Sequence, residues 1–155
     1  MRQHSGMRFP SRSYFEDEGT ALAKLEAVLW PSGPVCPHCG IRNRASRVVG
    51  HGARPGLWYC LVCRMQFRVT IGTPLEQSQV PANKWLLALA LQRHVQISIT
   101  ELSITLGVSY PTAQRMARVI RDTLPPRAHG SFDDAIRRFV RQAASALKQG
   151  RAAAD

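Results

Sequence analysis

Acidic residues are missing from the middle of this chain. No aspartate or glutamate lies between Glu26 and Glu76, although six arginines do. Lysine is scarce as well, with only three among 21 basic residues, and the formal net charge is +11. A genome-wide preference for arginine codons would explain the few lysines but not the missing acids. A chain this basic favours a polyanion as its partner, either nucleic acid or an anionic membrane surface.

Long apolar runs are absent too. No stretch approaches the 18 consecutive apolar residues of a membrane-spanning helix, and the first residues lack the apolar segment of a signal peptide. We therefore expect no membrane partner and a cytoplasmic location, at the nucleoid if the polyanion is DNA. In that reducing compartment, four cysteines are more typical of a metal site than of disulfides.

The four cysteines form two CxxC pairs. Twenty residues separate Cys36-x2-Cys39 from Cys60-x2-Cys63, a spacing typical of a tetrahedral Cys₄ zinc site. Four thiolates close the tetrahedron and leave no position for water, so the expected cofactor is one structural Zn²⁺. The first pair also reads as the active-site tetrapeptide of a thiol–disulfide oxidase. The second pair and the absence of a βαβ pattern around the first count against that alternative.

The hydrophobic pattern predicts an α+β fold in four segments. Apolar residues recur at helical spacing towards both ends of the chain, whereas glycine and proline separate short β-like runs in the middle. In chain order we expect a disordered N-terminus, a helix with a small antiparallel zinc ribbon, a helix-turn-helix, and an amphipathic helix with its tail. These segments cover residues 1–13, 14–76, 77–125 and 126–155.

Local signals place the elements inside these segments. A capping box at Ser13 starts the first helix, and Pro81 suits the first turn of the helix that follows the ribbon. Residues 72–80 are interpreted as a connector. Strands are expected over residues 47–49, 57–59 and 66–70.

Two short helices joined by a glycine follow. Ser98 and Ser109 are placed to cap them, and Gly107 ends the first. The second helix has an apolar face for the core and a polar outer face of the kind that reads a major groove. The predicted DNA contacts on this outer face are Tyr110, Thr112, Gln114, Arg115, Arg118 and Arg121. A plain helical hairpin with a solvated charged face is the alternative.

A second group of DNA contacts is expected on the ribbon. Arginine suits phosphate because its planar fork donates two hydrogen bonds at once. Phosphate contacts supply affinity without sequence information. We therefore predict that double-stranded DNA is the partner, and that ribbon phosphate contacts come from Arg42, Arg44, Arg64 and Arg68.

Four stretches of the chain resemble a known family. They are WPSGPVCPHCG at residues 30–40, YCLVCRMQFRVTIGTPLE at 59–76, KWLLAL at 84–89 and LGVSYPTAQRMARVIR at 106–121. Together they resemble the N-terminal part of bacterial insertion-sequence transposases that end in a DDE-type nuclease. The resemblance covers roughly residues 14–124, and it implies DNA binding at the ends of the element.

The nuclease of that family is expected to be missing. A two-metal nuclease gathers carboxylates from distant chain positions, and only residues 126–155 follow the predicted helix-turn-helix. We therefore expect a non-catalytic, sequence-specific DNA-binding protein, either a transcriptional regulator or an accessory factor of transposition. Two alternatives stay open. One is a scaffold that binds other proteins through the ribbon or the C-terminal helix, and the other is a transposase fragment whose nuclease is encoded separately.

Overall fold

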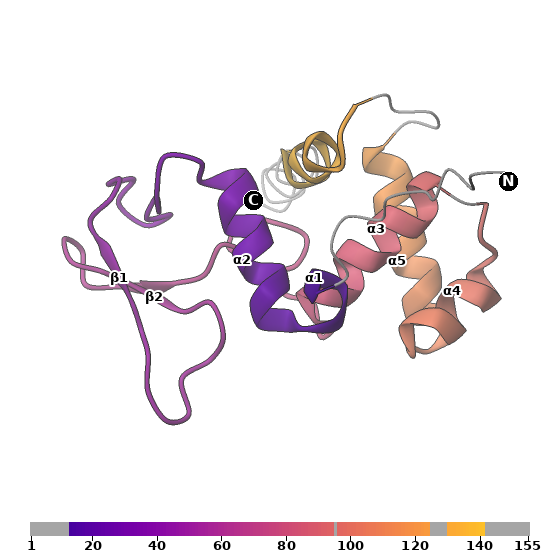
Figure 1. The fold of residues 1–155 in the computed structure, drawn as a ribbon, viewed down its shortest axis with the longest axis horizontal. Helices are drawn as coiled ribbons and strands as arrows, with labels where there is room; N and C mark the ends of the chain where they lie inside the picture. The colour runs from indigo at the N-terminus through magenta and orange to yellow at the C-terminus, as the bar shows by residue number, and fades with distance from the viewer. Residues whose placement is uncertain (1–12, 95, 125–129, 142–155) are drawn as a thin grey trace, which may run out of the picture.

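The computed structural model describes residues 13–94, 96–124 and 130–141. A three-stranded antiparallel sheet lies between two helical parts of the chain, which confirms the predicted α+β fold. Figure 1 shows β1 and β2 at one end of the long axis, α4 and α5 at the other, and α1, α2 and α3 between them. The predicted disorder of residues 1–12 and the predicted tail lie outside the described residues. Among the described residues, no helix has the length and apolar character needed to cross a membrane.

The N-terminal helical part consists of α1 (Ser13–Glu16) and α2 (Glu18–Leu29). The first helix begins at Ser13, where the sequence predicted a helix start, and Asp17 between the two helices caps the second. Asp17 has an extended backbone, and its side chain accepts a hydrogen bond from the Thr20 N–H at 2.8 Å. This extended residue ends α1 and starts α2, an interruption that the sequence did not predict.

The ribbon is a sheet in the order β1-β2-β3. Its strands are β1 (Ala45–Arg47), β2 (Trp58–Cys60) and β3 (Gln66–Phe67). Ala45 pairs with Cys60, and Trp58 pairs with Phe67. The first two strands therefore lie one or two residues closer to the cysteines than predicted, because the Leu61 N–H donates to the Arg44 carbonyl at 2.8 Å and extends the pairing to the metal-binding loop.

The third strand is shorter than predicted because the chain leaves the ribbon after Phe67. Phe67 is buried with Cys36 and Cys60, whereas Val69 is buried in the helical core. The alternating apolar pattern that predicted a strand over residues 66–70 therefore serves two different cores. The predicted connector that follows is partly buried, with Leu75 in the helical core.

The second helical part contains α3 (Ala82–His94), α4 (Ile99–Leu106) and α5 (Tyr110–Thr123). Gly107 adopts the left-handed conformation (φ 64°, ψ 40°) and ends α4, and Ser109 caps α5, both as predicted. The apolar faces of these helices are buried, with side chains that include Trp85, Leu86, Leu89, Leu102, Leu106, Ala113, Met116 and Ile120.

A helix over residues 132–141 packs against the other helices. The Phe132 ring stacks on Tyr14 with the ring centroids 6.1 Å apart, and the Phe139 ring lies 5.7 Å from that of Trp85. Ile136, which lies between these two residues in the sequence, is fully buried. Over the described residues, the apolar face of this helix packs against the chain's own α1 and α3.

Candidate metal centre and nucleic-acid interface

The two cysteine pairs lie in loops of matching conformation. In the first loop the Gly40 N–H donates to the Cys36 carbonyl at 2.8 Å, and in the second the Arg64 N–H donates to the Cys60 carbonyl at 3.0 Å. Gly40 and Arg64 both have a positive φ, 74° and 62° respectively. This left-handed residue turns each loop back on itself. Each loop is therefore one knuckle that presents two thiols on one side.

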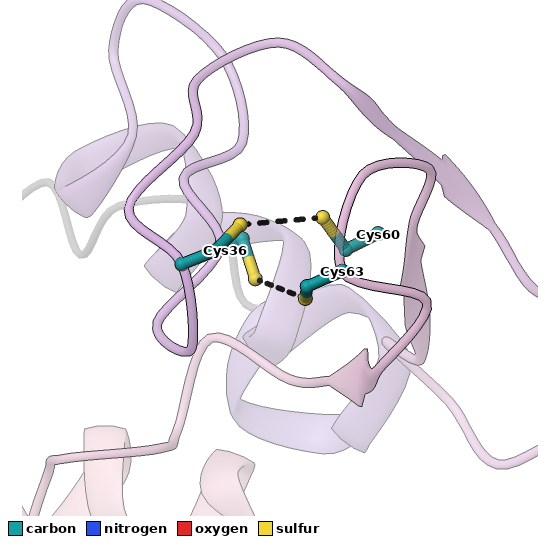
Figure 2. A group of neighbouring side chains, drawn as sticks. Cys36, Cys60 and Cys63 are labelled. Carbon is teal, nitrogen blue, oxygen red and sulfur yellow. Dashed lines mark hydrogen bonds between the residues drawn. The ribbon is translucent and has the colours of Figure 1, made fainter.

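The four sulfur atoms form a single cluster. All four Sγ atoms lie within 4.8 Å of one another. Between the knuckles, Cys36 Sγ lies 3.6 Å from Cys63 Sγ, and Cys39 Sγ lies 3.7 Å from Cys60 Sγ (Figure 2). A regular tetrahedron with Zn–S bonds of about 2.3 Å has edges of about 3.8 Å. The donor set and its geometry fit one structural zinc ion, which when bound ties the two knuckles together.

Backbone amides adjust the acidity of these thiols. The Cys63 N–H hydrogen-bonds to Cys60 and lowers the pKa of the Cys60 thiol to about 6. The Met65 N–H lowers the pKa of Cys63, but burial and the neighbouring thiols outweigh it and raise that pKa to about 12. A second thiolate next to a first one is unfavourable without a cation, because like charges at this distance repel. A divalent cation removes this repulsion and allows all four sulfurs to ionise.

A buried carboxylate, which the sequence analysis missed, joins the ribbon to α2. Glu26 is only 8% exposed. It accepts a hydrogen bond from Trp58 Nε1 at 2.9 Å and forms an ion pair with Arg47. The Arg47 guanidinium also lies over the Trp58 ring, 4.5 Å from its centroid. One signal was available: Glu26 lies four residues after the buried Leu22, on the apolar face of the helix.

The surface of α5 divides into two faces. Ala113, Met116, Ala117 and Ile120 are buried on one side. Five of the predicted DNA contacts are exposed on the other, namely Tyr110, Gln114, Arg115, Arg118 and Arg121. Thr112 is half-buried, and its hydroxyl lies 2.8 Å from the Ser109 hydroxyl in the helix cap. The structure thus brings these six side chains to one helix.

The ribbon arginines differ among themselves. Arg42, Arg44 and Arg64 are exposed, and none of the ion pairs within the described ranges involves them. Arg68 has an 18% exposed side chain and pairs with Glu18 of α2 at 3.4 Å. Its guanidinium has an intramolecular partner, so we leave Arg68 out of the DNA contacts proposed below.

Comparison with known proteins identifies this region. Residues 16–66 match the transposase zinc-ribbon domain family. A protein of Halobacterium salinarum described as an uncharacterized protein in transposable element ISH50 is 32% identical over 118 residues, which is 74% of this chain and 39% of that protein. The chain thus spans about two fifths of the length of this relative. No solved structure matches the chain. Residues 16–66 are therefore similar to the transposase zinc-ribbon domain, and the two matches together relate the chain to the N-terminal region of insertion-sequence transposases.

Proposed function

We propose that this chain binds double-stranded DNA, with α4 and α5 acting as a helix-turn-helix. The observation that carries the proposal is the division of α5 into a buried apolar face and an exposed face rich in arginine. Leu102 and Leu106 of α4 share the core with Ala113 and Met116 of α5. This shared core fixes the orientation of α5 relative to α4. A recognition helix needs such support to enter a major groove.

The exposed side chains of α5 are proposed to have two roles. Arg115, with Gln114, Tyr110 and Thr112, lies in the first half of the helix, which is the half that approaches base edges in such motifs. Arg118 and Arg121 lie further along and are proposed to contact phosphates. The exposed ribbon arginines Arg42, Arg44 and Arg64 contribute further phosphate contacts, which raise affinity for any sequence.

We further propose that residues 1–155 bind DNA without cutting it, as a regulator or as an accessory factor of transposition at the nucleoid. Two acids that could have belonged to a nuclease site have structural partners instead. Asp133 pairs with Lys24 at 2.7 Å. Asp134 accepts a hydrogen bond from the Ser131 hydroxyl, which caps the helix over residues 132–141, and it pairs with Arg137 at 3.0 Å. Chromosome-wide mapping of the bound protein distinguishes the two roles, since a regulator clusters at promoters and a transposition factor at element ends.

A second candidate function is protein binding by the ribbon. The knuckles expose three large apolar side chains, Leu61, Val62 and Met65, each at least half exposed. Exposed apolar surface of this kind is typical of interaction sites. The arginines beside it and the missing acids favour DNA as the first candidate, because phosphates match this charge.

The experiment compares three arginine variants on two kinds of DNA. Duplexes are first selected from a random pool with the zinc-loaded protein, and binding to the selected and to random duplexes is then measured across a salt series. Arg115→Ala should lose preference at one base position by roughly 5- to 150-fold, which corresponds to about 1–3 kcal/mol for a bidentate arginine–guanine contact. Arg118→Ala should weaken both DNAs alike and reduce the salt slope by about one unit.

Arg138→Ala is the matched control, because Arg138 is exposed on the helix over residues 132–141 and carries the same charge. It should leave both affinities nearly unchanged. Equal weakening of both DNAs by Arg115→Ala would show that the reading face is misassigned, with Arg118 one helical step away as its replacement. Binding to neither DNA at any salt concentration would refute the DNA-binding proposal itself.

A further inference from the structure

We propose that the ribbon and the α4–α5 pair hold one continuous DNA duplex at two places, and that the protein fixes the separation between them. The inference rests on the proposed DNA binding and deepens it by defining the shape of the site. Its basis is a series of contacts that make the ribbon and the helices one body. The acid-free, arginine-bearing ribbon and the exposed face of α5 are then two cationic surfaces on a rigid frame.

The two cationic surfaces lie far apart in the molecule. Figure 1 shows the ribbon at one end of the long axis and α4 with α5 at the other. Three exposed ribbon arginines belong to the first surface, Arg42, Arg44 and Arg64. A helix-turn-helix by itself occupies about one half-site of a duplex. Contacts at both ends of this molecule therefore extend the site beyond the part that α5 covers.

The first joint holds the ribbon on α2. The Glu26 carboxylate accepts from Trp58 Nε1 at 2.9 Å and pairs with Arg47 of β1. Trp30, which follows α2, packs edge-on against Trp58 and Phe67 with ring centroids 6.2 and 5.8 Å away. Buried polar contacts of this kind are directional, so together with the ring packing they set the angle between sheet and helix.

The second joint is the segment between β3 and α3. Thr70, Thr73, Leu75 and Val80 are buried along it. The Thr73 hydroxyl donates to the Thr70 carbonyl at 2.6 Å. At its end, Trp85 Nε1 of α3 donates to the Ser78 hydroxyl at 2.9 Å. Flexible linkers are exposed and lack such contacts. This buried segment therefore holds the ribbon in a fixed position relative to α3.

The helices complete the frame. Side chains of α2, α3, α4 and α5 share one buried cluster, in which Leu22, Leu89, Leu102 and Met116 are almost completely inaccessible. A close-packed core of this kind resists rearrangement. The position of the ribbon relative to α5 is therefore set by the fold and does not depend on a free linker.

A rigid protein with two DNA-binding surfaces can bind only a duplex in which the two contact regions have the right separation. The two contact regions must lie at one separation and on matching sides of the duplex, which turns once in about 10 base pairs. Modules on a flexible linker would accept a spacing longer by one full turn, because the second region then returns to the same side. The rigid frame predicts that half-turn and full-turn insertions both remove the ribbon contacts.

The test uses the zinc-loaded full chain and a random pool of duplexes of about four helical turns, roughly 40 base pairs. Hydroxyl-radical footprinting of the selected duplex should show two protected regions. Insertion of about 5 or about 10 base pairs between them should each reduce affinity at least tenfold. Because three phosphate contacts are lost, each insertion should also lower the salt slope by roughly two to three units.

Variants of the first joint test whether the contact between α2 and the ribbon fixes the separation of the two DNA-binding surfaces. Glu26→Gln should reduce the penalty of the full-turn insertion at least threefold, because a loosened ribbon reaches the displaced region. Glu16→Gln is the control, since Glu16 is an exposed acid on α1, and it should keep the penalty unchanged. Trp58→Phe removes the N–H that Glu26 accepts while keeping an aromatic ring, and it serves as the second variant if Glu26→Gln does not fold, as judged by zinc content and circular dichroism.

The outcomes are distinct. A single protected region, or full affinity for the duplex with the full-turn insertion, would overturn the fixed two-surface site while leaving the helix-turn-helix proposal intact. An unchanged insertion penalty in folded Glu26→Gln and Trp58→Phe would overturn the role of this joint in fixing the separation. No selectable duplex at all would overturn the proposed function and this inference together.

Discussion

The ribbon and the helical part of this protein are stabilised in different ways. Within the described residues, the buried residues of the ribbon core are Cys36, Cys60 and Phe67. The helical core there contains more than twenty buried residues in all, and each described helix contributes to it. A core of three side chains is too small to offset the entropy of ordering the roughly 40 residues from Trp30 to Phe67. The ribbon therefore depends on its metal ion, and the helical part depends on the burial of apolar surface.

The difference extends to the surfaces. The ribbon leaves large apolar side chains such as Leu61 and Val62 exposed and has no acidic residue of its own, whereas the helical part covers nearly all of its large apolar side chains. Metal coordination holds the knuckles without burying these exposed apolar side chains, so they and the arginines beside them are available for binding.

Loss of one metal ligand should have the largest effect. Cys60→Ser should release the zinc and unfold the ribbon, since zinc contributes on the order of 10 kcal/mol to the folding of such segments. Amide exchange should rise throughout the ribbon and remain slow in α3 and α5. Val62→Ser alters an exposed residue of the same knuckle and should retain one zinc per chain by elemental analysis. Folded, fully reduced protein without zinc would contradict the metal dependence of the ribbon.

A core substitution in the helical part should show the opposite pattern. Leu102 is completely buried on α4, and Leu102→Ala should lower the free energy of unfolding by about 2–5 kcal/mol because it leaves a cavity. Ile104 is 75% exposed on the same helix, and Ile104→Ala should change it by less than about 0.5 kcal/mol. Urea unfolding measures both, and zinc content should stay at one in each. Loss of zinc from Leu102→Ala would show that the two regions are not separately stabilised.

The smallest effect concerns the start of α4. The backbone N–H and the hydroxyl of Ser98 hydrogen-bond to Glu101 and hold its pKa below the ordinary 4.5. A lowered folded pKa means that this stabilisation is present above the unfolded pKa and is lost as pH falls through the folded pKa. Glu101→Gln keeps an acceptor for the capping box and should remove this acid dependence. Amide exchange in α4, compared between the two proteins at each pH, measures the effect, and identical profiles would contradict the assignment.

Several features could be predicted from the sequence because they depend on local spacing. Two CxxC pairs indicate a zinc site wherever the chain brings them together, and the sulfur positions confirm the geometry. Apolar residues at helical spacing marked the buried faces of α2, α3 and α5, and Gly107 with Ser109 marked the turn between α4 and α5. These signals are local because hydrogen bonds and caps join residues only a few positions apart.

Other features were decided by the tertiary structure. The end of β3 depends on the fact that Phe67 and Val69 belong to different cores, and the different role of Arg68 depends on Glu18, fifty residues away. The joint between α2 and the ribbon depends likewise on Glu26 meeting Arg47 and Trp58. The sequence by itself determined which elements form and which residues bind the metal. Only the packing of distant segments decided which charges are paired inside the protein and which remain exposed, because pairing depends on distances that no local pattern encodes.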